Sequence, residues 1–178
     1  GVYKSIFSGN YDPETMAYDM DDFLEELAAV ELRHAPGTYY DYSNVGPEIA
    51  AYILEQVYER SYRVQLQDLL NEVGMENTYL QDYEKHQDHL VIGYTEEGEP
   101  ATIDENPLLG GASGMITTLP DLAKFMKYQL ESNEPLIKES TKVLFEDEEQ
   151  DETVGYFWDV GFAEEEGFYY FKTGNSNG

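Results

Sequence analysis

Two short motifs overlap at the end of the chain, and each would place a different side chain in a reaction. Residues 174–178 (GNSNG) fit G-x-S-x-G, in which a serine on a sharp strand-to-helix turn acts as the nucleophile. Residues 172–174 (KTG) fit K-T-G, in which a strand carries a lysine toward a cleft. Because the two motifs share Gly174, we expect only one of them to be functional.

The serine motif lacks the partners that its chemistry needs. In enzymes with G-x-S-x-G, an acid and a histidine follow the serine in the chain, but nothing follows Gly178 in this sequence. Residues 168–172 (FYYFK) have the aromatic composition of a strand that could carry Lys172. We therefore interpret the ending as K-T-G. Three residues are a weak match by themselves, so the interpretation needs a partner motif upstream.

The central part of the chain supplies that partner motif. Residues 36–80 contain PGT, then Tyr42-Ser43-Asn44 just before a long predicted helix, and then a capped helix that ends in GMENT. Residues 110–126 (GGASGMITTLPDLAKFM) follow in the same order. This arrangement resembles the serine β-lactamase-related family, of the class C β-lactamase and DD-peptidase type. On that resemblance, residues 42–44 match the family's Y-x-N motif and residues 172–174 its K-T-G motif.

The resemblance implies acyl transfer through a serine ester. A serine must lose its proton to attack a carbonyl, and the tetrahedral oxyanion must be stabilised. The family pattern assigns the proton to Tyr42, whose phenol has an ordinary pKa of about 10 and needs nearby cations such as Lys172 to lower it. Asn44 has both a donor and an acceptor, so it could hold a substrate amide and a lysine together.

The same resemblance assigns substrate contacts to the end of the chain. Lys172 and Thr173 would meet the substrate carboxylate beside Gly174, and the N–H of Asn175 would form one half of the oxyanion hole. K-T-G in place of H-x-G favours β-lactams or D-Ala-D-Ala-type peptides as substrates. An esterase or amidase of the same fold is the alternative, as is a non-catalytic relative that binds cell-wall peptide or a protein partner.

One departure from the family pattern limits what this chain can do alone. The family's nucleophile lies in S-x-x-K at the start of an upstream helix, and the 178 residues contain no S-x-x-K. We therefore expect an internal piece of such an enzyme, or a naturally reduced relative, that does not turn over substrate as written. Without the family context, Tyr42 could be one of 16 tyrosines packed against a helix start, and Asn44 a helix-start residue.

Composition excludes several other classes of function. The chain has 37 acidic residues against 10 Lys and Arg, a net charge of −27, which disfavours nucleic acid and anionic membranes as partners. A salt-rich habitat would screen this charge, although a merely acidic protein is the simpler interpretation. The absence of cysteine excludes disulfides and thiol catalysis. His86 and His89 form H-x-x-H, but no third ligand is apparent, so we expect neither a metal nor a cofactor.

The elements that must position these residues predict an α+β fold. We expect the helical subdomain of a β-lactamase/transpeptidase-like fold over residues 1–153, and an antiparallel hairpin in an incomplete sheet over residues 154–178. Its exposed strand edges could pair two copies in a homodimer. No apolar run approaches the roughly 20 residues of a membrane span, and the family resemblance implies a periplasmic or extracellular location.

Hydrophobic periodicity and capping signals place the individual helices. Either Asp19 or Asp21 is the predicted cap of the first helix, Ser61 is the predicted cap of the third, and Gly74 is a predicted helix stop. A helix opened by Thr118 and Pro120 should turn an apolar stripe inward, formed by Leu122, Phe125, Met126 and Leu130. The acidic run 145–152 is interpreted as solvated. The predicted elements are helices over 19–32, 47–60, 61–73 and 140–145, and strands over 154–162 and 168–174.

Overall fold

The computed structural model describes residues 18–80, 83–101, 108–165 and 167–174, which form two compact units. Unit 1 contains the described residues within 18–31 and 43–125. Unit 2 contains residues 32–42 together with the described residues within 126–174. Helices and antiparallel strands are both present, so the α+β class predicted from the sequence is confirmed.

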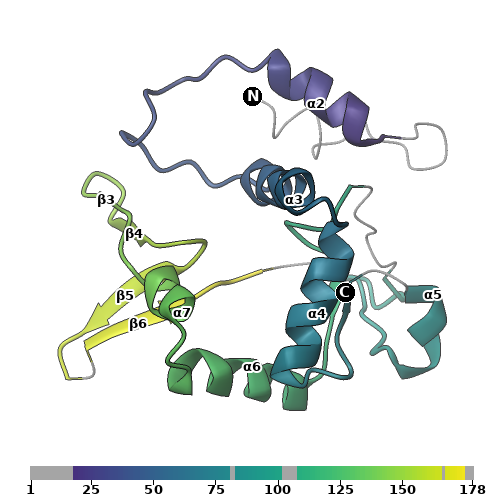
Figure 1. The fold of residues 1–178 in the computed structure, drawn as a ribbon. Helices are drawn as coiled ribbons and strands as arrows, with labels where there is room; N and C mark the ends of the chain where they lie inside the picture. Colours follow the sequence, from purple (N-terminus) through teal and green to yellow (C-terminus); the bar gives the residue numbers. More distant parts are fainter. Residues whose placement is uncertain (1–17, 81–82, 102–107, 166, 175–178) are drawn as a thin grey trace. The chain divides into compact units, whose positions relative to one another are not determined.

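Unit 1 is mainly helical (Figure 1). Its two short strands pair antiparallel, with Tyr79 opposite Ile116. The last helix of this unit continues past Phe125 into unit 2. The elements are α2 (Met20–Ala28), α3 (Val45–Tyr58), α4 (Tyr62–Val73), β1 (Tyr79–Leu80), α5 (Tyr83–His86), the 3-10 helix η1 (Gln87–His89), β2 (Met115–Ile116) and α6 (Leu119–Glu131).

The predicted helix caps are confirmed. The Asp19 carboxylate accepts hydrogen bonds from the N–H groups of Asp21 and Asp22 at the start of α2, and Ser61 accepts from Val64 at the start of α4. Gly74 ends α4 in the left-handed region, at φ 79°, where glycine carries no Cβ penalty.

The predicted helix bounds need two corrections. Helix α2 ends at Ala28 and not at residue 32, because the N–H of Ala29 already turns back to the carbonyl of Glu26 in a tighter turn. The short helix predicted over 140–145 is instead α7 (Pro135–Ser140). Proline is well suited to the first helical position, since its missing N–H is not needed there, so the helix begins at Pro135.

The buried face of α6 differs from the predicted one. Leu122, Met126 and Leu130 are 48%, 60% and 77% exposed, and only Phe125 of the predicted stripe is half-buried. The fully buried residue of the helix is Asp121. In α3, Ile53 and Val57 are exposed, whereas Glu48 is buried together with Val45 and Ala51. Both helices therefore turn a carboxylate toward the interior.

Asp121 lies in a network of hydrogen bonds that joins α6 to the segment after α4. One carboxylate oxygen accepts from the Asn77 N–H (2.7 Å) and the Thr78 hydroxyl (3.0 Å), and the other accepts from Lys124 Nζ (2.8 Å). Lys124 Nζ also donates to the carbonyl of Gly74. The bond from Lys124 is the main reason that the pKa of Asp121 is lowered; burial opposes the shift, and Asn77 and Thr78 reinforce it.

A second cluster in unit 1 is apolar and centres on Phe23, which is fully buried, and Val45. It brings together residues from α2, α3 and the segment before the Gly-rich turn. The side chains packed against it are those of Tyr18, Met20, Leu24, Leu27, Ile49 and Leu108.

Unit 2 carries a four-stranded antiparallel sheet in the order β3-β4-β5-β6 (Figure 1). The strands are β3 (Phe145–Asp147), β4 (Glu152–Val154), β5 (Asp159–Ala163) and β6 (Gly167–Phe171). The predicted hairpin is confirmed as β5–β6, with Val160 opposite Tyr170. Its first strand, predicted over 154–162, is interrupted at 155–158, so Val154 ends β4 and β5 begins at Asp159. Among the described residues β6 pairs with β5 alone, and the homodimer through strand edges stays a prediction.

The acidic run 145–152 is a hairpin and not simply a solvated segment. It contains β3, a turn over residues 148–151 and the start of β4, with Asp147 opposite Glu152. Asp147 is 8% exposed, and its Oδ1 accepts from the N–H groups of Glu149 and Gln150. The carboxylate thus caps the turn, which composition alone did not reveal.

None of the helices in the described parts of the chain has the length and apolarity to cross a membrane.

Replacing Asp121 by Asn should destabilise unit 1, because an amide offers one acceptor oxygen where three donors converge. We expect the Tm at pH 7 to fall by about 5 °C or more. A carboxyl whose folded pKa is lowered stabilises the fold above its ordinary pKa, and this stabilisation is lost as the pH falls through the folded pKa. The parent should therefore lose more stability than the variant below about pH 4.

Thermal unfolding followed by circular dichroism at pH 7 and at acid pH would measure this. The matched control is Glu72→Gln, which removes one charge from an exposed position of α4. Equal melting temperatures for both variants would contradict the role given to the buried carboxylate.

Candidate functional site

Unit 2 brings together two of the residues that the sequence motifs single out. Lys172 follows β6, and Tyr42 ends the irregular segment 32–42. The Lys172 Nζ lies over the Tyr42 ring, 5.1 Å from its centroid. A cation at this distance from an aromatic face is attracted by the negative charge above the ring. A phenol and an ammonium that are distant in the sequence are therefore neighbours in space, while their catalytic role stays a prediction.

Lys172 is held in this place by Asp159, the first residue of β5. Its Nζ donates to both carboxylate oxygens, at 2.9 and 3.0 Å. The two side chains are 36% and 16% exposed, so the pair is partly shielded from water. The register of the hairpin explains the contact, because Asp159 lies opposite Phe171, next to Lys172. Sequence analysis did not identify Asp159, although pairing residues outward from the acidic sequence between the two predicted strands would have pointed to it.

The pKa of the Tyr40 phenol depends on the charges around this site. Burial raises the pKa of the Tyr40 phenol above its ordinary value; the ammonium of Lys172 opposes the rise, and the carboxylates of Asp159 and Glu152 add to it. Tyr42 contributes in the same direction. The Tyr40 phenol therefore lies within the field of the Lys172 ammonium and of the Asp159 and Glu152 carboxylates.

The segment that carries the two tyrosines is shaped by contacts of its own. Gly37 has φ 76°, in the left-handed region, and the N–H and hydroxyl of Thr38 both donate to the carbonyl of Ala35. This turn is the PGT of the sequence. Arg33 pairs with Asp41 at 2.9 Å, with both side chains exposed. The motif is thus a turn that leads the chain to Tyr42.

The other predicted site residues lie elsewhere in the chain or outside the described residues. Asn44 belongs to unit 1, at the N-cap position of α3, where its side chain makes no capping hydrogen bond. Thr173 and Gly174 follow Lys172 and are exposed. Asn175 lies outside the described residues, as does Ser176 of the alternative serine motif. The substrate contacts assigned to these residues stay predictions.

The glycine-rich segment near residue 110 is fixed to the start of α3 by Glu48. The two oxygens of this buried carboxylate accept hydrogen bonds from the N–H groups of Leu109 and Ala112, each at 3.2 Å. Gly111 packs against the carbonyl of Pro47, where a Cβ would collide with backbone. Glu48 was not identified from the sequence, because a glutamate in an amphipathic helix is ordinarily exposed.

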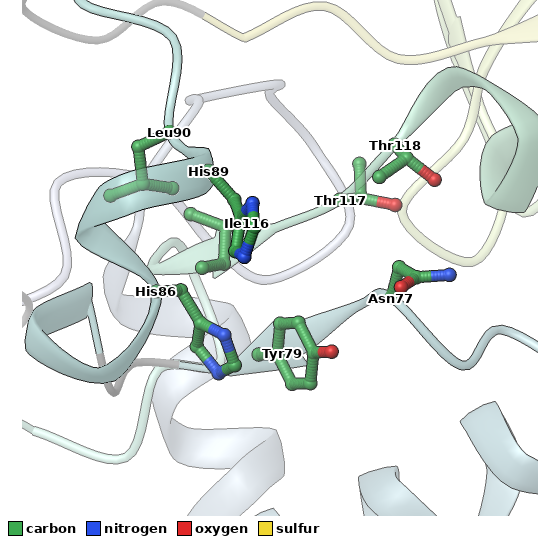
Figure 2. A pocket seen from close by; sticks show the side chains of 8 residues that line it. All are labelled: Asn77, Tyr79, His86, His89, Leu90, Ile116, Thr117 and Thr118. Atoms are coloured by element: carbon green, nitrogen blue, oxygen red, sulfur yellow. The ribbon is translucent and has the colours of Figure 1, made fainter.

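A pocket of about 240 Å³ in unit 1 collects the two histidines of H-x-x-H. It is lined by Asn77, Tyr79, His86, His89, Leu90, Ile116, Thr117 and Thr118. Figure 2 shows the His86 ring against Tyr79, and the two rings stack with their centroids 3.8 Å apart. No group of three or more His, Cys, Asp or Glu in the described part of the chain is arranged to hold a metal ion. In the H-x-x-H motif, His86 therefore packs against Tyr79.

The chain is similar to known proteins in sequence and in fold. Residues 5–178 match the family model described as Beta-lactamase. Among curated proteins, the chain is similar to Protein flp of Staphylococcus aureus (strain MW2), with 26% identity over 132 residues. The match covers 70% of this chain and 26% of that protein, so the chain spans about a quarter of the length of this relative.

Solved structures with the same fold include enzymes of this family. A β-lactamase/D-alanine carboxypeptidase from Pseudomonas syringae superposes with a TM-score of 0.71 and 17% identity, over 92% of this chain and 52% of that one. A D-alanine carboxypeptidase AmpC from Burkholderia cenocepacia gives 0.71 and 23%, over 85% and 43%. A penicillin-binding protein homologue from Pyrococcus abyssi, described as octameric, gives 0.69 and 20%, over 90% and 38%. At these identities the likeness shows the fold.

Replacing Asp159 by Asn should release the Lys172 ammonium from its two acceptors. We expect acetylation of Lys172 by an N-hydroxysuccinimide ester to become about two- to five-fold faster, as loss of a partly exposed ion pair allows. Peptide mass spectrometry would measure the rate. Asp151→Asn is the matched control, since it removes an exposed carboxylate from the same sheet. An equal rate in the two variants would mean that Asp159 does not restrain the lysine.

Proposed function

The chain belongs to the β-lactamase family, and from this premise we propose that it forms the base-and-cation half of a serine hydrolase that acts by acyl transfer. Members of this family are serine hydrolases of the β-lactamase and carboxypeptidase type. The observation that carries the proposal is the contact between Lys172 Nζ and the Tyr42 ring, 5.1 Å from its centroid. Both residues come from the motifs that the family uses for chemistry.

In this proposal Tyr42 takes the proton of the attacking serine, and Lys172 stabilises the phenolate that results. A nearby ammonium favours the charged form of a phenol, because it lowers the energy of the oxyanion more than that of the neutral ring. Asp159 keeps the ammonium at the sheet. Because Asp159 also neutralises part of its charge, we expect Lys172 to serve as an orienting cation that the substrate carboxylate can share.

The remaining motif residues would act on the substrate. Asn44 would hold the substrate amide, Thr173 and Gly174 would line its carboxylate end, and the Asn175 N–H would donate to the oxyanion. The nucleophile itself would come from an S-x-x-K segment, which these 178 residues do not contain. The chain spans about half or less of the structures it matches, so the activity proposed is that of a longer protein.

We propose β-lactams or D-Ala-D-Ala-type peptides as substrates, because the third motif is K-T-G, and a periplasmic or extracellular location. A peptide or lactam that ends in a carboxylate would find its counter-ion in Lys172, which an uncharged ester would not need.

Labelling with a fluorescent penicillin tests this function in the complete gene product, once its sequence shows an S-x-x-K upstream. Tyr42→Phe removes the phenol oxygen and keeps the ring over Lys172, so we expect the rate of labelling to fall about 10²- to 10⁴-fold, as for loss of a general base. Tyr169→Phe is the matched control on β6, and it should leave the rate unchanged.

Two results would count against the proposal. If Tyr42→Phe is labelled as fast as Tyr169→Phe, the phenol is not the base. If the complete protein hydrolyses a nitrophenyl ester but is not labelled by penicillin, it is an esterase of the same fold and not a penicillin-recognising enzyme.

A further inference from the structure

The segment that carries Tyr42 has little to hold it in place through packing. Residues 31–39 are exposed, and no helix or strand is formed between α2 and α3. The cation–π contact of Tyr42 with Lys172 is worth only about 0.5–1 kcal/mol at an exposed site. Such a contact by itself is too weak to order a loop, since fixing the backbone of one residue costs about 1–2 kcal/mol. The position of the tyrosine must therefore depend on how the main chain of its segment is held.

The turn between β3 and β4 supplies that interaction at Tyr40. The Tyr40 N–H donates to Asp147 Oδ2 at 3.0 Å, and the Tyr40 carbonyl accepts from Gln150 Nε2 at 2.8 Å. Gln150 Nε2 also donates to Asp147 Oδ2, at 2.7 Å. Asp147 and Gln150 thus bind both main-chain polar groups of Tyr40 and are hydrogen-bonded to each other. We call this pair of side chains the clamp. A peptide held at its N–H and its C=O has its position and its direction fixed.

We propose that Asp147 and Gln150 are positioning residues, which hold the main chain at Tyr40 so that the phenol of Tyr42 lies beside Lys172. The inference rests on the proposed function, in which Tyr42 is the base. It assigns a role to an acidic turn that no motif marks. The two partners of the pair are then fixed independently, the lysine by Asp159 on β5 and the tyrosine by the turn after β3.

A purely structural role for Asp147 can be separated from the positioning role. Its Oδ1 accepts from the N–H groups of Glu149 and Gln150, and these bonds stay within the turn. Its Oδ2 and the Gln150 side chain face Tyr40, far away in the sequence. Gln150 is exposed, so its side chain can be shortened without opening a cavity. A change at Gln150 therefore removes half of the clamp and leaves the turn capped.

The test uses the chain of residues 1–178 and nuclear Overhauser effects between the Tyr42 ring and the Lys172 side chain. In Gln150→Ala we expect this contact to be lost, while the cross-strand contacts between β5 and β6 remain. Gln150→Arg keeps N–H donors at the end of the side chain and should retain the contact. Glu149→Ala is the matched control, because Glu149 contributes its main-chain N–H to the turn and not its carboxylate.

Asp147→Asn provides a second variant that removes charge from the clamp while an amide oxygen remains to cap the turn. We expect it to weaken the contact between Tyr42 and Lys172 with the β5–β6 hairpin intact. The proposal is overturned if the contact persists in both Gln150→Ala and Asp147→Asn. It is also overturned if the contact disappears in the Glu149→Ala control as it does in Gln150→Ala.

Penicillin labelling tests the positioning role independently of the nuclear Overhauser measurement. In a complete protein that penicillin labels, Gln150→Ala should lower the acylation rate constant and leave the apparent affinity for penicillin unchanged, since the clamp acts on Tyr42 and not on the substrate. A loss of affinity with an unchanged rate constant would overturn the positioning role. If the unsubstituted complete protein does not react with penicillin, the proposed function is overturned. The positioning role is then still tested by the magnetic resonance data on the contact between Tyr42 and Lys172.

Discussion

The structure depends on carboxylates that are buried and accept hydrogen bonds from the main chain of distant segments. The buried acidic residues among those described are Glu48, Asp121 and Asp147. Each accepts a backbone N–H from a segment more than 40 positions away in the sequence, respectively from Leu109 and Ala112, Asn77 and Tyr40. Loop N–H groups that leave water need an acceptor, and an ionised oxygen makes the stronger bond. Acidic residues therefore close the long loops of both units.

This use of acidic residues suits a chain with a net charge of −27. Repulsion among surface carboxylates acts over the Debye length, which shrinks to about 3 Å in molar salt. Hydrogen bonds to a buried carboxylate are shielded from water, so salt screens them much less. The interactions that close the fold and the repulsion that opposes it thus respond differently to ionic strength.

The sequence predicts what is decided locally. Asp19, Ser61 and Gly74 mark helix ends because a cap involves residues within one turn of each other. The β5–β6 hairpin was equally visible, since two aromatic segments flank a short acidic turn. The buried face of α6 was predicted wrongly because Asp121, like Glu48 in α3, has a side chain that is ordinarily exposed. Nothing within the helix shows that a loop from elsewhere in the chain will bring N–H groups to them.

In the candidate site too, some residues could be predicted from the sequence and others could not. Tyr42 and Lys172 were found from motifs, because a motif records residues of a given type at a given spacing, and the structure brings the two side chains together. Asp159 and Asp147, which hold them, belong to no motif, because any residue with an acceptor in the right place would serve. The chain has 37 acidic residues, so the sequence alone does not distinguish these two aspartates from the others.

Packing cannot replace these polar contacts in unit 2. Among the described residues, its one buried apolar side chain is Val160, whereas unit 1 has a cluster around Phe23. Apolar contacts are non-directional, so a core of that size does little to fix the direction of a loop. Hydrogen bonds are directional, and in this unit they join Asp147 and Gln150 to Tyr40 and Asp159 to Lys172. In the proposed arrangement these polar side chains set the geometry of Tyr42 and Lys172, and a comparison of relatives by their motifs alone would miss them.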